Sequence, residues 1–163
     1  MTDDAPNVAR NSRFAVMARR PGGMPIDAAV ARAETSLAGM ASEYQQWLRN
    51  DLAALEQAVD RASASQGQDD EAMAALYRCA GAVRDLGTTF GQPLVTVVAD
   101  KLCELVHRHR QRHGRLYAGD AVHAHLAALR LVGQPLYAGR APADAGPLLD
   151  GLSAIVAKFP AAG

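Results

Sequence analysis

Hydrophobic residues recur every three or four positions along most of this chain, and that spacing places them on one face of an α-helix. The first such stretch begins at Asp27, where Pro25 and Asp27 supply a helix start signal. Gly39 and Ser42 are candidate break points that would divide it into a short helix and a longer one. Its hydrophobic stripe consists of Val30, Ala33, Leu37, Met40, Tyr44, Trp47, Leu48, Leu52, Leu55, Val59 and Ala62.

A loop at residues 65–68 separates this stretch from a helix that we expect over residues 70–87. The acidic residues 69–71 favour a helix start there, because the macrodipole attracts negative charge to the N-terminus. A break over residues 88–93 follows, and the next helix should end near Gly114. The inward positions of these two helices are Met73, Leu76, Cys79, Ala80, Val83 and Leu86, then Leu94, Val98, Leu102 and Leu105.

Two more helices complete the predicted order. Gly119 and Asp120 open the first of them, and its hydrophobic stripe reaches Leu136. A turn over residues 142–147 precedes the last helix, which we expect over residues 148–159. No segment alternates between hydrophobic and polar residues, as a half-buried strand would.

Composition supports an all-α fold. Apolar residues make up 49% of the chain but aromatic residues only 5%, and much of the apolar content is alanine, the best helix former. The length of 163 residues predicts one domain, which we place at residues 26–159. Residues 1–25 contain prolines and glycines without hydrophobic periodicity, so we expect them to be a disordered leader.

Charge argues against two classes of partner. Seventeen basic residues balance seventeen acidic ones, so nothing steers the whole chain toward nucleic acid or an anionic membrane. The arginine-rich run at residues 108–115 has only Tyr117 nearby to stack on bases, and we expect no nucleic-acid binding. The chain also shows neither a membrane span nor a signal peptide, which favours a cytoplasmic location.

Candidate chemistry is sparse. The sequence contains no nucleophile elbow, zinc-protease motif or phosphate-binding loop. His109 and His113 have the spacing of a metal pair, but arginines surround them and zinc needs three or four ligands. We therefore expect no metal and no cofactor. Cys79 and Cys103 lie on or beside the hydrophobic faces of their helices and should behave as small hydrophobic residues.

The outward side of the helix over residues 70–87 is unusual because a glycine lies in its middle. Gly81 costs about 1 kcal/mol relative to alanine, and it either is incidental or lets another backbone come close. Opposite the inward positions lie Tyr77, Gly81, Arg84, Asp85 and Thr88.

This region resembles the histidine-containing phosphotransfer (Hpt) domains of bacterial two-component phosphorelays. The likeness rests on residues 76–95, LYRCAGAVRDLGTTFGQPLV, which include the Phe-Gly-x-Pro-Leu-Val turn of family members. Residues 99–105 look like the family's next helix, and the layout agrees over roughly residues 27–137. The resemblance implies an Hpt-like antiparallel four-helix bundle, here with additional N-terminal and C-terminal helices.

The sequence departs from the family where the chemistry takes place. Family members read A-H-D-x-K-G on this helix, and the phosphoryl-accepting histidine falls on Gly81, which has no nucleophile. The lysine falls on Arg84, which keeps the positive charge, and the small glycine falls on Asp85, which repels a phosphoryl group. None of the five histidines is followed by the x-x-K-G pattern, so no shifted register restores the motif.

The chain therefore resembles a pseudo-Hpt, a scaffold without the phosphoryl carrier. In the family, the exposed face around the histidine docks on a receiver domain. We accordingly expect a non-catalytic module, not an enzyme, that binds a response-regulator receiver domain or a histidine kinase. The expected contact face is Tyr77, Arg78, Gly81, Arg84, Asp85 and Thr88.

Three other interpretations stay open from the sequence. In the first, the predicted contact face is only the solvated side of a helix. In the second, His125 or His107 carries a phosphoryl group in place of the missing histidine. In the third, the chain is a structural bundle that self-associates through exposed Trp47 or Tyr44. A core position for Trp47 is the commoner outcome for a residue on a hydrophobic stripe.

Overall fold

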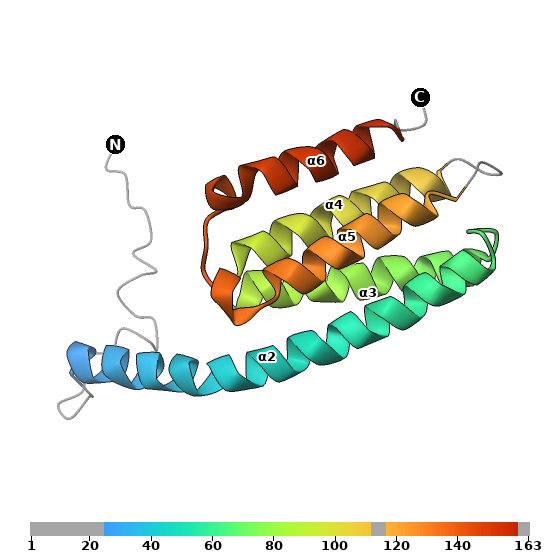
Figure 1. Cartoon of the computed structure of the whole chain (residues 1–163). Coiled ribbons are helices and arrows are strands. Elements are labelled where there is room, and N and C mark those ends of the chain that lie inside the picture. Colours follow the sequence, from blue (N-terminus) through green and yellow to red (C-terminus); the bar gives the residue numbers. More distant parts are fainter. Residues whose placement is uncertain (1–24, 112–116, 160–163) are drawn as a thin grey trace, which may run out of the picture. The chain divides into compact units, whose positions relative to one another are not determined.

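The computed structural model describes residues 25–111 and 117–159, and every regular element in these ranges is helical (Figure 1). The expected all-α class is confirmed for this part of the chain. Apart from Pro25, the predicted leader lies outside the described residues. The elements are α2 (Ile26–Ala64), α3 (Asp70–Thr89), α4 (Pro93–Arg110), α5 (Gly119–Val132), the 3₁₀ helices η2 (Pro135–Tyr137) and η3 (Pro142–Ala145), and α6 (Gly146–Ala157).

Helix α2 continues through the predicted break point. Its hydrogen-bonded turns run from Ile26 to Ala64 without interruption, so the expected division at Gly39 and Ser42 is wrong. The reason is energetic, because a lone glycine costs a helix only about 1 kcal/mol and no proline accompanies it. Residue contacts nevertheless divide the chain into two compact units, Met1–Met40 and Ala41–Gly163. The single domain over residues 26–159 stays a prediction.

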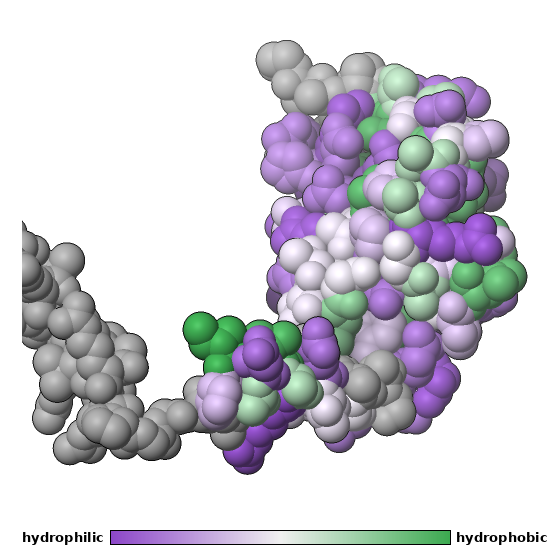
Figure 2. Space-filling view, turned by 90° about the vertical axis from the view of Figure 1, so that its left-hand side faces the viewer, coloured by the Kyte–Doolittle hydropathy of each residue, from purple (hydrophilic) through white to green (hydrophobic). Residues whose placement is uncertain are grey.

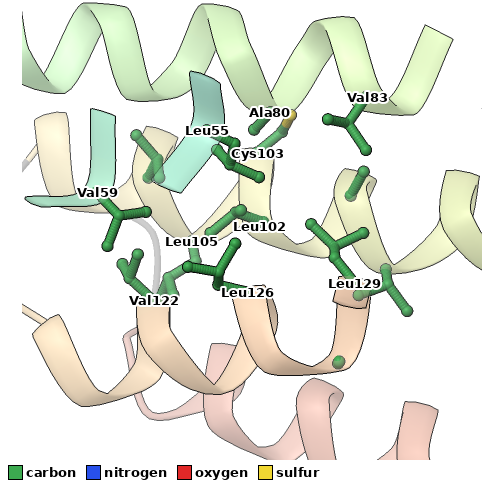
Figure 3. Packing of buried hydrophobic residues seen from close by; sticks show 14 of the residues in the cluster. Leu55, Val59, Ala80, Val83, Leu102, Cys103, Leu105, Val122, Leu126 and Leu129 are labelled. Atoms are coloured by element: carbon green, nitrogen blue, oxygen red, sulfur yellow. The ribbon is translucent and has the colours of Figure 1, made fainter. Parts of the chain in front are cut away.

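The hydrophobic core belongs to the second unit. Figure 3 shows how side chains from α2, α3, α4 and α5 meet in its centre. Helix α4 contacts α3, α5 and α6, and α6 also contacts α5. The core residues that Figure 3 labels are Leu55, Val59, Ala80, Val83, Leu102, Cys103, Leu105, Val122, Leu126 and Leu129.

Both ends of α3 follow from short-range signals in the sequence. The side chain of Asp69 accepts hydrogen bonds from the backbone N–H groups of Glu71 and Ala72, at 2.9 and 3.2 Å, and so caps the helix. At the other end the helix reaches Thr89, two residues further than expected. Gly91 adopts a positive φ of 63°, which reverses the chain within a few residues of the first residue of α4.

Several hydrophobic positions differ from their expected placement. Trp47 is 39% exposed, although it packs on Phe90 with ring centroids 5.5 Å apart, so its expected core position is wrong. Leu136 is 69% exposed because α5 ends at Val132 and the chain continues as η2. Val30 and Met40 of the first unit are exposed as well. A periodic stripe identifies the hydrophobic face of a helix but not what covers it.

Two further boundaries are corrected. Helix α4 ends at Arg110 rather than near Gly114, which lies outside the described residues. The predicted turn over residues 142–147 is the 3₁₀ helix η3, and it leads directly into α6 at Gly146. Proline in the first turn is compatible with both helices, because its missing N–H has no partner there.

Candidate functional site

All six predicted contact residues lie on α3 outside its buried face. Ala72, Met73, Leu76, Ala80, Val83 and Gly87 are buried along the inward face of the helix. Of the predicted residues, four are exposed and two, Gly81 and Arg84, are half-buried. The exposed ones are Tyr77, Arg78, Asp85 and Thr88.

Gly81 faces open space. A Cβ atom placed on it would meet nothing within 4 Å. The surface of α3 is therefore depressed at this point because a side chain is missing, and no neighbouring element requires a glycine there. Gly87, two turns later, is the opposite case. A Cβ there would lie 2.9 Å from Thr96 Oγ1 and 3.0 Å from the Thr96 backbone nitrogen of α4. The close approach of α3 and α4 thus depends on Gly87 and not on Gly81.

A shallow cleft lies beside this low point, between α3 and α4. Its volume is about 270 Å³, and α4 contributes most of its lining. The rings of Tyr77 and His107 face each other across it, with centroids 6.4 Å apart. The residues that line it are Tyr77, Arg84, Asp100, Cys103, Glu104 and His107.

On the α4 side of the cleft, only His107 was among the predicted candidates, as an alternative phosphoryl acceptor. Asp100, Glu104 and His107 follow one another at helical spacing and so share one flank of α4. The signal was available in principle, because this flank adjoins the inward positions Leu102 and Leu105. Sequence reasoning missed it because no pattern states which flank of α4 borders the outward side of α3.

Arg84 is the cation at the centre of this face. Its Nε lies 3.0 Å from Asp85 Oδ1, and its Nη1 lies 3.6 Å from Asp100 Oδ1 on α4. The hydrogen bond and charge of Asp85 raise the pKa of the Arg84 guanidinium, with a smaller contribution from Asp100. Arg84 therefore stays charged and already holds two carboxylates within the chain.

The other arginines near the face also have acidic neighbours. Arg78 donates a hydrogen bond to Glu71 of the same helix, at 2.8 Å. Arg108 pairs with Glu104, and its Nη1 also donates to the backbone carbonyls of Val156 and Phe159, at 3.2 and 3.1 Å. Rather than a free basic helix end, Arg108 thus ties α4 to the end of α6. The face is charge-balanced and lacks a strong basic patch.

The two cysteines differ in burial. Cys103 is 4% exposed, and burial raises the pKa of its thiol to about 11, so little thiolate exists at neutral pH. Cys79 is half-buried and packs against the core. Cys103 thus lacks the lowered thiol pKa of a reactive nucleophile, and neither thiol is fully exposed.

The two histidines considered as alternative phosphoryl acceptors have opposite surroundings. His125 is fully buried, and its Nδ1 lies 2.7 Å from the carbonyl oxygen of Ala121. Burial lowers the pKa of this imidazole. A phosphoryl donor cannot reach it without opening of the core, so the burial argues against His125 as the acceptor. His107 is exposed on α4, with Nε2 2.8 Å from the Gln111 side-chain nitrogen.

Metal binding finds no support in the part of the chain that the structure describes. Within residues 25–111 and 117–159, no three histidine, cysteine, aspartate or glutamate side chains gather closely enough to hold an ion. His109 instead packs edge-on against Tyr117, with ring centroids 5.7 Å apart. Its predicted companion His113 lies outside the described residues.

A second hollow lies at the turn that joins α3 to α4. Its volume is about 430 Å³, and most of its surface is apolar. The turn shapes it, because Gly91 and Pro93 leave few side-chain atoms there. Thr88, one of the predicted contact residues, is part of its wall, so this hollow continues the outward face of α3.

Comparisons with known proteins find no relative of this chain. No family model, no curated protein and no solved structure matches it. Within the described residues, no helix combines the length and the apolar character needed to cross a membrane.

Proposed function

We propose that this chain is a degenerate Hpt-like signalling module that binds a response-regulator receiver domain, or a histidine kinase, without carrying a phosphoryl group. In this proposal α2, α3, α4 and α5 form the antiparallel four-helix bundle of the family, and the module modulates a two-component pathway by occupying its partner. The docking face is the outward side of α3 together with the neighbouring flank of α4.

The position of Gly81 is the observation that carries the proposal. The residue that aligns with the family's phosphorylated histidine lies on the outward side of α3, at a point with no neighbour within 4 Å. A partner surface can approach the backbone of α3 there more closely than it could approach an imidazole. Because glycine has no nucleophile, the contact transfers nothing.

Shape supports the same face. The cleft beside Gly81 and the apolar hollow at the α3–α4 turn lie along one side of α3, and each is lined in part by outward residues of this helix. A concave, partly apolar surface with a few fixed charges is typical of binding sites. Tyr77 at one end adds an aromatic side chain of the kind enriched at protein interfaces.

Arg84 gives the face its polarity. In the family resemblance it takes the place of a lysine and would meet the acidic pocket of a receiver domain. Since Asp85 and Asp100 already pair with it, docking exchanges carboxylate partners and does not neutralise a free charge. The planar guanidinium suits this exchange, because it presents five donors and binds carboxylates in pairs.

A second candidate function is phosphotransfer through His107. One observation favours it, since His107 is exposed and lines the cleft beside Gly81. Against it, Glu104 lines the same cleft and repels an incoming phosphoryl group. The two functions differ in one product, an acid-labile phosphate on the wild-type chain.

The test is a titration of the chain against a panel of receiver domains from the same genome, each with and without a phosphoryl mimic. Two results together support the proposal. The first is saturable binding with a dissociation constant of about 1 μM, which corresponds to about −8 kcal/mol. The second is that no acid-labile phosphate forms on the chain after incubation with a phosphorylated receiver. An acid-labile phosphate that His107→Gln abolishes would instead establish the second function. Absence of binding to every receiver domain, together with absence of an acid-labile phosphate, would refute docking on a receiver and the second function alike.

A further inference from the structure

The first turns of α2 expose a hydrophobic face. Within the unit Met1–Met40, Ile26 is 80% exposed, Val30 50% and Met40 38%. Ala33 is exposed as well. Figure 2 shows hydrophobic side chains at the surface where α2 begins, next to hydrophilic ones. Single exposed hydrophobic residues are ordinary, but a series of them along one helix face is typical of an interaction surface.

The spacing of these residues is that of a coiled coil. Ile26, Val30, Ala33, Leu37 and Met40 are separated by four, three, four and three residues, which is the a/d pattern of a heptad repeat. A strict 3.5-residue period keeps the hydrophobic seam toward one partner helix over its whole length. A partner with the same period fits best, and the chain itself supplies one.

Charge on the two sides of the seam also favours a second copy. Asp27 and Glu34 both follow a d position and so occupy e positions. In a parallel, in-register pair, Glu34 lies across the seam from Ala29 of the second copy, so no like charges meet. An antiparallel pair would place e positions against e positions and bring these carboxylates together.

A membrane surface is a poorer occupant for the same face. Helices that lie in a membrane interface carry lysine and arginine on their polar side. Between Ile26 and Met40 the only basic residue is Arg32, and two acidic residues outnumber it. The charge of this segment does not attract anionic lipid headgroups.

We propose that the segment Ile26–Met40 pairs with the same segment of a second copy as a short parallel coiled coil, and that the chain is a dimer through α2. The segment is already helical in the single chain, so pairing need not nucleate a helix. With only two heptads the dimer should be reversible. The inference is independent of the proposed function.

Sedimentation equilibrium of the full chain, from low to high micromolar concentration, tests the proposal. The matched variants are Val30→Glu in the seam and Ala28→Glu at an f position, because each adds one carboxylate to an exposed site. We expect a reversible dimer that Ala28→Glu preserves and that Val30→Glu weakens by at least about tenfold, since a charge enters the seam. Circular dichroism must show equal helix content in all three.

The orientation has its own readout. Ile26→Cys should form a disulfide-linked dimer under mild oxidation, because identical d positions face each other only in a parallel, in-register pair. Wild-type chain, with Cys79 and Cys103 alone, is the control. A monomer at every concentration, or equal weakening by Val30→Glu and Ala28→Glu, would overturn the coiled coil. A chain that dimerises but forms no Ile26→Cys cross-link would overturn the parallel arrangement.

Discussion

Arg84 on α3 and Asp100 on α4 pair across the cleft, with 3.6 Å between guanidinium Nη1 and carboxylate Oδ1. Asp85 holds the same guanidinium from its own helix, at 3.0 Å from Nε. This arrangement fixes the Arg84 guanidinium in position within the cleft. Under the proposed function, a partner must offer Arg84 a better set of acceptors than these two exposed aspartates.

Removal of the Arg84 charge should weaken partner binding without unfolding the protein. We expect Arg84→Gln to raise the dissociation constant for the receiver by about tenfold, or about 1.4 kcal/mol, because the cleft keeps Asp100 and Glu104, with Asp85 beside it, and becomes acidic. Calorimetric titration measures the change. The melting temperature should hardly move, since exposed ion pairs contribute little to stability.

The control for this variant is Arg130→Gln. Arg130 of α5 donates to Glu56 of α2, at 2.7 Å, and is likewise an ion-paired arginine, more exposed than Arg84, but it lies outside the proposed face. It should leave receiver binding unchanged. Equal loss of affinity in both variants would indicate a general effect of charge and would remove Arg84 from the contact face.

Sequence periodicity predicted the helical class well, because 3.6-residue spacing and end signals are local. The Asp69 cap and the Gly91–Pro93 turn signals predicted both ends of α3 to within a few residues. The predicted break at Gly39 is wrong because one glycine does not outweigh the surrounding helix formers. Such local signals determine where helices run, but not which neighbours they acquire.

The candidate functional site could likewise be predicted only in part from the sequence. The outward side of α3 could be predicted, since buried Leu76, Ala80 and Val83 define its opposite. The α4 side of the cleft could not, because it depends on how two helices are rotated against each other. The partners of Arg108 were likewise not predictable from the sequence, because the two carbonyls that accept its hydrogen bonds lie at the end of α6, far along the chain.

Two glycines of α3 should respond to alanine in opposite directions. Gly81→Ala should stabilise the protein by about 0.5–1 kcal/mol, because a Cβ there meets open space and alanine is the better helix former. Gly87→Ala should destabilise it, since the new Cβ would lie 2.9 Å from Thr96 Oγ1 and 3.0 Å from a backbone nitrogen. Urea unfolding of both variants measures the difference. Destabilisation by Gly81→Ala would show that position 81 is packed.

Burial of His125 should make stability fall on acidification. Burial lowers the pKa of its imidazole below the ordinary 6.5, so the unfolded chain binds the proton more readily. The neutral, buried imidazole therefore makes its full contribution to folding stability above about pH 6.5, and this contribution is lost as the pH falls toward the folded-state pKa. His125→Leu should remove this part of the pH dependence, as thermal unfolding between about pH 8 and pH 5 can measure.

His123→Gln serves as the control for His125→Leu. His123 lies on the same helix but is exposed, with Nδ1 2.9 Å from the carbonyl oxygen of Gly119. This variant should keep the acid sensitivity of the wild type. If His125→Leu retained that sensitivity in full, the imidazole would have to be accessible to protons in the folded state.

Arg108 should matter for the attachment of α6. Arg108→Ala removes the donor to the carbonyls of Val156 and Phe159 and should destabilise the protein by about 1–2 kcal/mol. Hydrogen exchange should quicken chiefly in α6. Arg110→Ala, an exposed neighbour on α4, should change neither quantity. Unchanged exchange in α6 after loss of Arg108 would contradict this role.

The most direct test of the docking face compares two open helical glycines. At both Gly81 of α3 and Gly151 of α6, an added Cβ atom would meet nothing within 4 Å, so glutamine fits at either position without strain. Titration of the receiver that binds the wild type should show unchanged affinity for Gly151→Gln and a loss of at least about tenfold for Gly81→Gln, because the added side chain holds the partner away from α3. Equal affinity of both variants would contradict docking at Gly81.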